Sequence, residues 1–156
     1  MQLPAIIALF VVSATARTII QDRQVSVNTD MIPLDFGITR NSQCLGAKGK
    51  SIPCNCPPDS RDPDFIAKLG QSLSQGFFPD ASIVTPLTLE KFNNVDDKSE
   101  ATNRQRATAM VQVLQSLSGN KGQGCPGVSY PNIISQQSTG VFGGVAGGNV
   151  GNAGKF

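Results

Sequence analysis

The four cysteines constrain this chain more than any other feature. Cys44, Cys54 and Cys56 lie close together, whereas Cys125 follows far along the sequence. Four cysteines can form two disulfides in three ways. A bond between Cys54 and Cys56 would strain a ring with a single residue between them, so two pairings stay open. Each joins one of these two cysteines to Cys44 and the other to Cys125. The long bond closes a loop of about seventy residues, for which chain entropy suggests a stabilisation on the order of 4 kcal/mol.

The first sixteen residues indicate the compartment in which these disulfides would form. An apolar run over 5–12 precedes the small residues of 13–16, a pattern typical of a signal peptide and its cleavage site. The run is shorter than the roughly 20 residues that a membrane span needs. A buried N-terminal helix is the alternative, which the lack of Lys or Arg before the run favours. We predict a secreted, extracellular protein that begins at Arg17 after cleavage, with no membrane span and with disulfides formed on export.

The stretch between Cys44 and Cys56 suggests two other chemistries, and its details argue against both. Gly49-Lys50-Ser51 resembles the end of a phosphate-binding loop, but Cys44 stands where the first glycine is required and Pro53 follows where a helix should begin. Zinc-binding cysteines are typically two residues apart, and Cys54 and Cys56 have only Asn55 between them. We therefore expect neither a cofactor nor a metal. Lys48 and Lys50 would instead form an exposed basic tip on a disulfide-closed loop.

Histidine is absent, and this excludes several classes of enzyme. Ser-His-Asp and Cys-His systems and the common histidine-containing zinc sites all need an imidazole. The net charge of +2, without a basic stripe interleaved with aromatic residues, argues against a nucleic-acid partner. Carboxylate chemistry is the remaining enzymatic alternative, but no spacing singles out a catalytic pair. Its candidate residues are Asp59, Asp62, Asp64, Asp80, Glu90, Asp96, Asp97 and Glu100.

Two amphipathic helices are predicted after the cysteine cluster. Asp62 and Pro63 mark the start of the first, over about residues 63–75, and Gly76 its end. Its apolar face comprises Phe65, Ile66, Leu69 and Leu73. The second starts near Asp97, because Asp97-Lys-Ser-Glu100 has the spacing of a capping box, and stops at 119–120. Its apolar stripe comprises Ala107, Met110, Val111, Leu114 and Leu117.

The sequence thus predicts a mainly α, small disulfide-stapled domain with extended connecting segments and disordered ends. Residues 1–16 form the signal peptide. Residues 17–43 form an N-terminal arm that is an edge strand, a pro-segment or poorly ordered. The stapled helical domain covers 44–138. The tail over 139–156 is so rich in glycine that we expect it to be flexible.

Several short motifs resemble a group of small secreted fungal proteins without an established activity. They are the run from Ile52 to Asp62, which contains Cys-Asn-Cys-Pro-Pro, then 65–69, 113–119 and Gly124-Cys125-Pro126. The resemblance covers about residues 52–127. It implies secretion, disulfide pairing and a helix-rich middle, and it implies no catalytic residues.

We therefore expect a secreted, non-enzymatic protein that acts through contacts with an extracellular protein or a wall polysaccharide, in an effector-like or surface-associated role. The alternatives are a carboxylate-dependent extracellular hydrolase and a structural wall component. Two close carboxylates in a cleft would favour the hydrolase, whereas carboxylates used as helix caps would argue against it.

Overall fold

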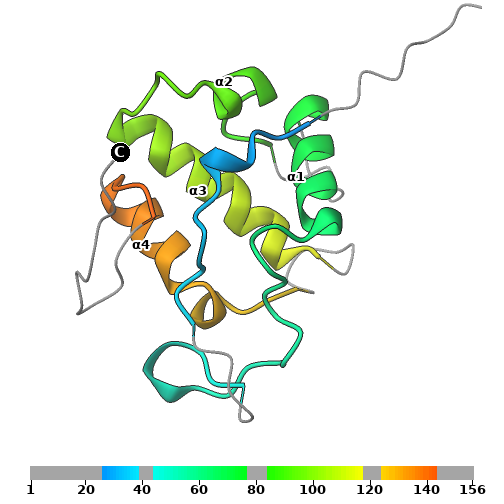
Figure 1. The fold of residues 1–156 in the computed structure, drawn as a ribbon, viewed down its shortest axis with the longest axis vertical. Helices are drawn as coiled ribbons and strands as arrows, with labels where there is room; N and C mark the ends of the chain where they lie inside the picture. Colours follow the sequence, from blue (N-terminus) through cyan, green and yellow to red (C-terminus); the bar gives the residue numbers. More distant parts are fainter. Residues whose placement is uncertain (1–25, 39–43, 77–83, 118–123, 144–156) are drawn as a thin grey trace, which may run out of the picture.

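Helix α3 (Glu100–Gln115) forms the centre of the fold, with α1 (Pro63–Gln75) on one side and α4 (Pro131–Thr139) on the other (Figure 1). The computed structural model describes residues 26–38, 44–76, 84–117 and 124–143. Within these ranges there are two further kinds of element: the short helix α2 (Leu89–Asn93) and three 3-10 turns. The turns are η1 (Thr29–Met31), η2 (Ala47–Gly49) and η3 (Gly127–Ser129). The described residues contain no strand, so the predicted mainly α, disulfide-stapled fold is confirmed.

Helix α1 has the bounds that the sequence predicts. The carboxylate of Asp62 accepts hydrogen bonds from the backbone N–H groups of Asp64 and Phe65, and Pro63 occupies the first turn. At the other end Gly76 has φ +79°, a left-handed conformation that costs glycine little. Phe65, Leu69 and Leu73 are buried, so the predicted apolar face packs against the core.

Helix α3 starts two residues later than the capping-box pattern predicts. Its N-cap is Ser99, whose hydroxyl accepts a hydrogen bond from Thr102 N–H. Asp97 precedes the helix and accepts hydrogen bonds from the hydroxyls of both Ser99 and Thr102. The prediction of Asp97 as the cap is therefore wrong, because Ser99 competes for the same position. The helix ends at Gln115, and the predicted stop at 119–120 lies outside the described residues. Of the predicted stripe, Ala107, Met110, Val111 and Leu114 are buried and Leu117 is partly buried.

Helices α2 and α4 are not among the two helices that the sequence predicts. The Thr88 hydroxyl caps α2 by accepting a hydrogen bond from Lys91 N–H. Helix α4 begins with Pro131 and ends at Gly140, which has φ +79°. Both helices are short, and α4 buries only Ile133 and Gln136. This is too little for a periodic apolar pattern to stand out.

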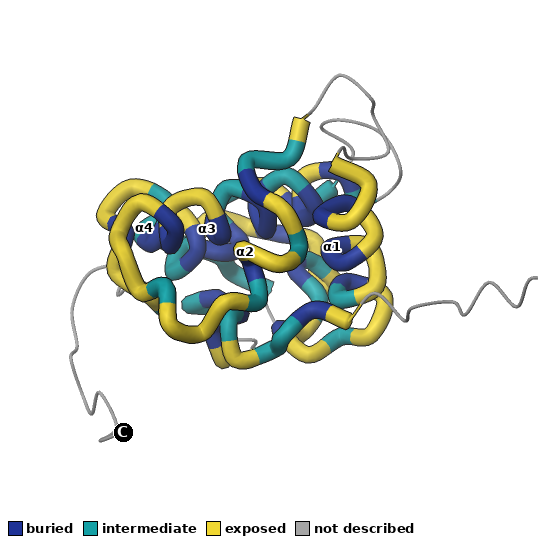
Figure 2. The backbone as a smooth tube through the Cα atoms, turned by 90° about the horizontal axis from the view of Figure 1, so that it is seen from above, coloured by how far each residue is buried: buried dark blue, intermediate teal, exposed yellow. Residues whose placement is uncertain are grey.

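The N-terminal segment 26–38 belongs to the core. Val27, Ile32 and Phe36 are all buried, and the rings of Phe36 and Phe65 pack edge to face with centroids 5.8 Å apart. Phe36 O also accepts a hydrogen bond from Asn132 N–H at the start of α4. Figure 2 shows the buried segments gathered between α1, α3 and α4, with exposed backbone around them. The folded unit therefore begins before the boundary at Cys44 that the sequence suggests.

The remaining predictions about the ends of the chain lie outside the described residues. These are the signal peptide, the first part of the arm and the tail from residue 144 onward. Among the residues that the structure describes, no helix is long and apolar enough to cross a membrane.

Candidate functional site

Both disulfides are formed within the described chain. Cys44 bonds to Cys54 and Cys56 to Cys125, with Cα atoms 4.9 and 5.3 Å apart. The structure thus selects one of the two pairings that the sequence leaves open. One bond closes a short loop, whereas the other joins the entrance of α1 to the segment that follows α3.

Residues 44–54, which we call the basic loop, form a small hairpin-like turn. Ile52 N–H donates to Cys44 O at 2.9 Å, and Gly46 N–H donates to Lys50 O at 2.7 Å. The turn at its tip places Lys48 at φ +56° and Gly49 at φ +68°. Because the Cys44–Cys54 disulfide and the backbone hydrogen bonds close the loop together, its tip is held in one arrangement.

The tip of the basic loop faces solvent, while its base packs on η3. Lys48 and Lys50 are exposed, as the sequence predicts, whereas Ile52 is buried. A Cβ atom added to Gly46 would lie 2.5 Å from Val128 O, so the backbones of the loop and of η3 are in close contact there. No helix follows Ser51 before Cys54, which agrees with the rejection of a phosphate-binding loop. The loop lies at the end of the molecule opposite α2 (Figure 1).

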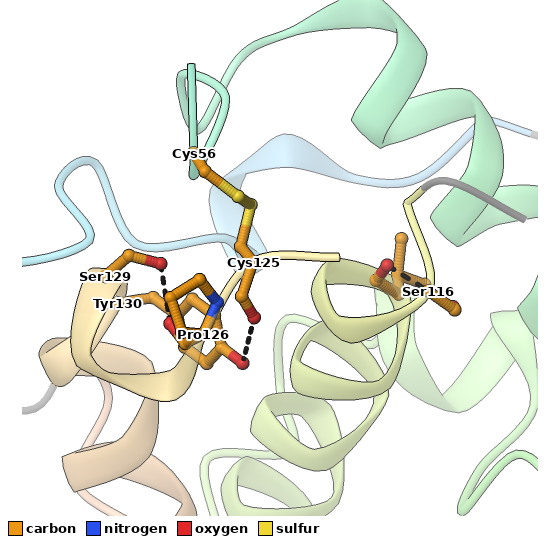
Figure 3. Close-up of a disulfide and its surroundings, with 7 residues drawn as sticks. Cys56, Ser116, Cys125, Pro126, Ser129 and Tyr130 are labelled. Atoms are coloured by element: carbon orange, nitrogen blue, oxygen red, sulfur yellow. Dashed lines mark hydrogen bonds between the residues drawn. A yellow bond between two sulfur atoms is a disulfide. The ribbon is translucent and has the colours of Figure 1, made fainter. Parts of the chain in front are cut away.

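The second disulfide anchors this end of the molecule to the core (Figure 3). Cys125 is buried, and its N–H donates to Leu114 O at 2.8 Å near the end of α3. Its carbonyl accepts a hydrogen bond from the hydroxyl of Tyr130, which is fully buried. Burial raises the pKa of Tyr130, so this phenol stays protonated and remains a donor at neutral pH.

Three of the carboxylates that the sequence offers for catalysis are placed by their contacts in the described chain. Asp62 caps α1. Glu100 Oε2 lies 3.6 Å from Arg104 Nη2 on the surface of α3. Glu90 lines a surface hollow of about 590 Å³ with Thr88, Lys91, Asn93 and Asn94, which offer no second carboxylate. Asp80 lies outside the described residues. No three Cys, Asp or Glu side chains in the described ranges are placed to hold a metal ion.

Among the described acidic residues, Asp97 is the one whose pKa the structure clearly shifts. Hydrogen bonds from the Thr102 and Ser99 hydroxyls and from Ser99 N–H lower the pKa of its carboxyl to about 2. Such a group remains ionised at neutral pH and is a poor proton donor. Its partners lie at the start of α3, which makes its role structural.

Sequence reasoning missed Arg106 on α3, whose side chain donates five hydrogen bonds. The residue is only 2% exposed, and all five N–H groups of its guanidinium have acceptors. The only signal in the sequence was its position one turn before Met110, on the stripe predicted to be buried. Burial lowers the pKa of Arg106, and the nearby Asp97 carboxylate opposes this change. The acceptors are the carbonyls of Lys91, Phe92, Asn94 and Asp97 and the side-chain oxygen of Asn103.

Comparisons with known proteins do not extend this description. No family model matches the chain, and neither a curated protein nor a solved structure matches it. Its two disulfides are compatible with an extracellular protein.

Proposed function

We propose that this chain is a secreted, non-enzymatic protein that acts by binding an anionic extracellular surface through the basic loop. The observation that carries the proposal is the fixed, solvent-facing position of Lys48 and Lys50 on a loop closed by a disulfide. The signal-peptide pattern and the resemblance of residues 52–127 to small secreted fungal proteins support the same proposal.

The charge of the loop defines the chemistry of the partner. Between Cys44 and Cys54 the sequence has two lysines and no acidic residue, so the loop offers two ammonium groups without a competing carboxylate. The closed turn limits the conformational entropy lost on binding, because the backbone is already ordered. Exposed ion pairs contribute only about 0.2 to 1 kcal/mol each. A repeating anionic partner, such as an acidic wall polysaccharide, fits best because many weak contacts can act together.

Secretion is tested by the intact mass of protein recovered from the culture medium, measured before and after reduction and alkylation. We expect a chain that lacks residues 1–16 and has four cysteines that react only after reduction. Recovery of a full-length chain with free thiols would contradict export through a cleaved signal peptide and an oxidising compartment.

Binding is tested by sedimentation with the insoluble wall fraction of the secreting cells at increasing salt. The test variant is Lys48→Ala/Lys50→Ala. The matched control is Lys91→Ala/Lys98→Ala, which removes two exposed lysines from elsewhere on the surface. We expect salt-sensitive binding by the wild type and the control, and a severalfold loss for the test variant. Equal losses in both variants, or no binding by the wild type, would exclude the basic loop as the contact site.

A further inference from the structure

The two disulfides lie in different surroundings. Cys54 is exposed and Cys44 is half-buried, so a small thiol can approach the short disulfide from solvent. Cys125 is only 2% exposed, and Cys56 packs against the core beside it. Because thiol–disulfide exchange requires direct attack on a sulfur atom, access alone favours reaction at the Cys44–Cys54 bond.

The basic loop is also separate from the hydrophobic core. Ile52 is its one buried hydrophobic residue, and no residue of 44–54 belongs to the main core cluster. In contrast, Cys125 is part of that cluster, together with residues from the 26–38 segment and from all four helices. Opening the short disulfide therefore removes no core contact, whereas opening the long one exposes part of the core.

We propose that the Cys44–Cys54 disulfide is a reducible latch, which a small dithiol opens while the Cys56–Cys125 disulfide stays closed. One thiolate of the dithiol attacks Sγ of Cys54, and Cys44 leaves as a thiolate that takes up a proton. The second thiol then attacks the mixed disulfide and releases the Cys54 thiol. The dithiol becomes a cyclic disulfide, so two electrons pass to the protein.

Opening the Cys44–Cys54 disulfide makes the peptide bonds at the tip of the basic loop accessible to a protease. In the closed loop Lys50 N–H donates to Ala47 O and Lys50 O accepts from Gly46 N–H, so both backbone groups of Lys50 are occupied. Lys48 has left-handed backbone geometry, which is not that of an extended strand. A bound peptide that pairs as an added strand needs an extended backbone with free N–H and C=O groups. The closed loop therefore protects the bonds after Lys48 and Lys50, and reduction exposes them to a trypsin-like protease.

Opening the Cys44–Cys54 disulfide would release Lys48 and Lys50 from their fixed arrangement. This affects binding only if the proposed function holds. The opening itself depends on neither the partner nor the binding. The experiment below contains no binding step, so a failure of the latch and a failure of the proposed function can be told apart.

The test is a dithiothreitol titration of the full secreted chain, followed by iodoacetamide quenching and peptide mass mapping. We expect Cys44 and Cys54 to be alkylated about tenfold faster than Cys56 and Cys125, with helical circular dichroism unchanged at that stage. Trypsin should then cleave after Lys48 or Lys50 only in the partly reduced sample. Simultaneous alkylation of all four cysteines, or alkylation of Cys56 and Cys125 first, would overturn the proposal. Paired labelling of Cys44 with Cys56 would also overturn it, because that pattern indicates exchange between the two disulfides.

Two double variants give an independent test. Cys44→Ser/Cys54→Ser should keep the helical signal and unfold cooperatively, and trypsin should cleave its loop without reduction. Cys56→Ser/Cys125→Ser is the matched control and should lose its cooperative transition. If the first variant fails to fold, or if its loop resists trypsin as the wild type does, the proposal is wrong.

Discussion

The helical body and the basic loop are held together in different ways. The body, formed by 26–38 and the four helices, is stabilised by contacts between segments far apart in the sequence. The guanidinium of Arg106, for example, fixes the 91–97 segment against α3. The loop is closed by hydrogen bonds between near neighbours and by the Cys44–Cys54 disulfide. We infer from this difference that the body specifies the fold. The loop can then open, by reduction of its disulfide, without unfolding the molecule.

Buried polar groups between α3 and α4 extend this contrast. The amide of Asn103 donates to Gly140 O at 3.1 Å, and the amide of Gln136 donates to Asn103 O at 3.1 Å. Gly143 N–H in turn donates to the side-chain oxygen of Gln136. These contacts fix the segment after α4 against the start of α3. In the basic loop, by contrast, hydrogen bonds join backbone groups of the loop itself, such as Ile52 N–H to Cys44 O.

The largest effect is expected from Arg106→Met, which removes the side chain that organises the 91–97 segment. Several buried acceptors would lose their donor at once, so we expect a loss of about 3 to 5 kcal/mol in the free energy of unfolding. Urea denaturation followed by circular dichroism measures this loss. If the body and the loop are separate, the rate at which dithiothreitol reduces Cys44–Cys54 in the folded protein should not change.

Arg104→Met is the control, because Arg104 lies on the same helix but forms an exposed pair with Glu100. Its loss should cost less than about 1 kcal/mol. Similar losses for the two arginine variants would show that the buried network contributes little.

A smaller effect is expected where the chain after α4 meets the start of α3. Gly140 has φ +79°, and an added Cβ would lie 2.5 Å from the Cβ of Glu100. Gly143 has a similar φ of +74°, but an added Cβ would meet no atom within 4 Å. Gly140→Ala should therefore cost about 2 to 3 kcal/mol and Gly143→Ala about 1 kcal/mol, both measured by thermal unfolding. Equal costs would mean that this contact does not hold the two segments together.

The smallest effect concerns Asp97, which is only partly buried. Because folding lowers the pKa of its carboxyl from 3.8 to about 2, its contribution to stability is fully present above pH 4. That contribution is lost as the pH falls towards 2. Asp97→Asn should therefore reduce the pH dependence of the unfolding free energy between pH 4 and 2. Asp96→Asn, an exposed neighbour, controls for the change in charge, and an unchanged slope in Asp97→Asn would contradict the role of these hydrogen bonds.

Local signals in the sequence were sufficient to predict some helices and insufficient to predict others. Helix α1 could be predicted because Asp62, Pro63 and Gly76 each act within one turn of the helix ends. The start of α3 was misplaced because Asp97 and Ser99 both carry an oxygen suited to a cap. Helix α4 was missed because its buried face depends on Gln136, whose partner Asn103 is distant in the sequence.

In the candidate site, too, some features could be predicted from local sequence patterns and others could not. The cysteines and the two lysines could be named from the sequence, because a cysteine cluster separated by a basic stretch is a local pattern. The choice between Cys54 and Cys56 as the partner of Cys125 could not be made, since it depends on how the chain is placed in space. The role of Arg106 was hidden for the same reason, because its acceptors are brought together by the loop between α2 and α3.

The spectroscopic signal of Tyr130 reports on the helical body and not on the basic loop. Tyr130 is the only tyrosine, and the sequence has no tryptophan. Its ring is fully buried, and its hydroxyl contacts the Cys125 carbonyl beside the long disulfide (Figure 3). Near-ultraviolet absorbance and intrinsic fluorescence of the unlabelled chain should therefore follow the packing of the helical body and stay nearly unchanged while the basic loop opens.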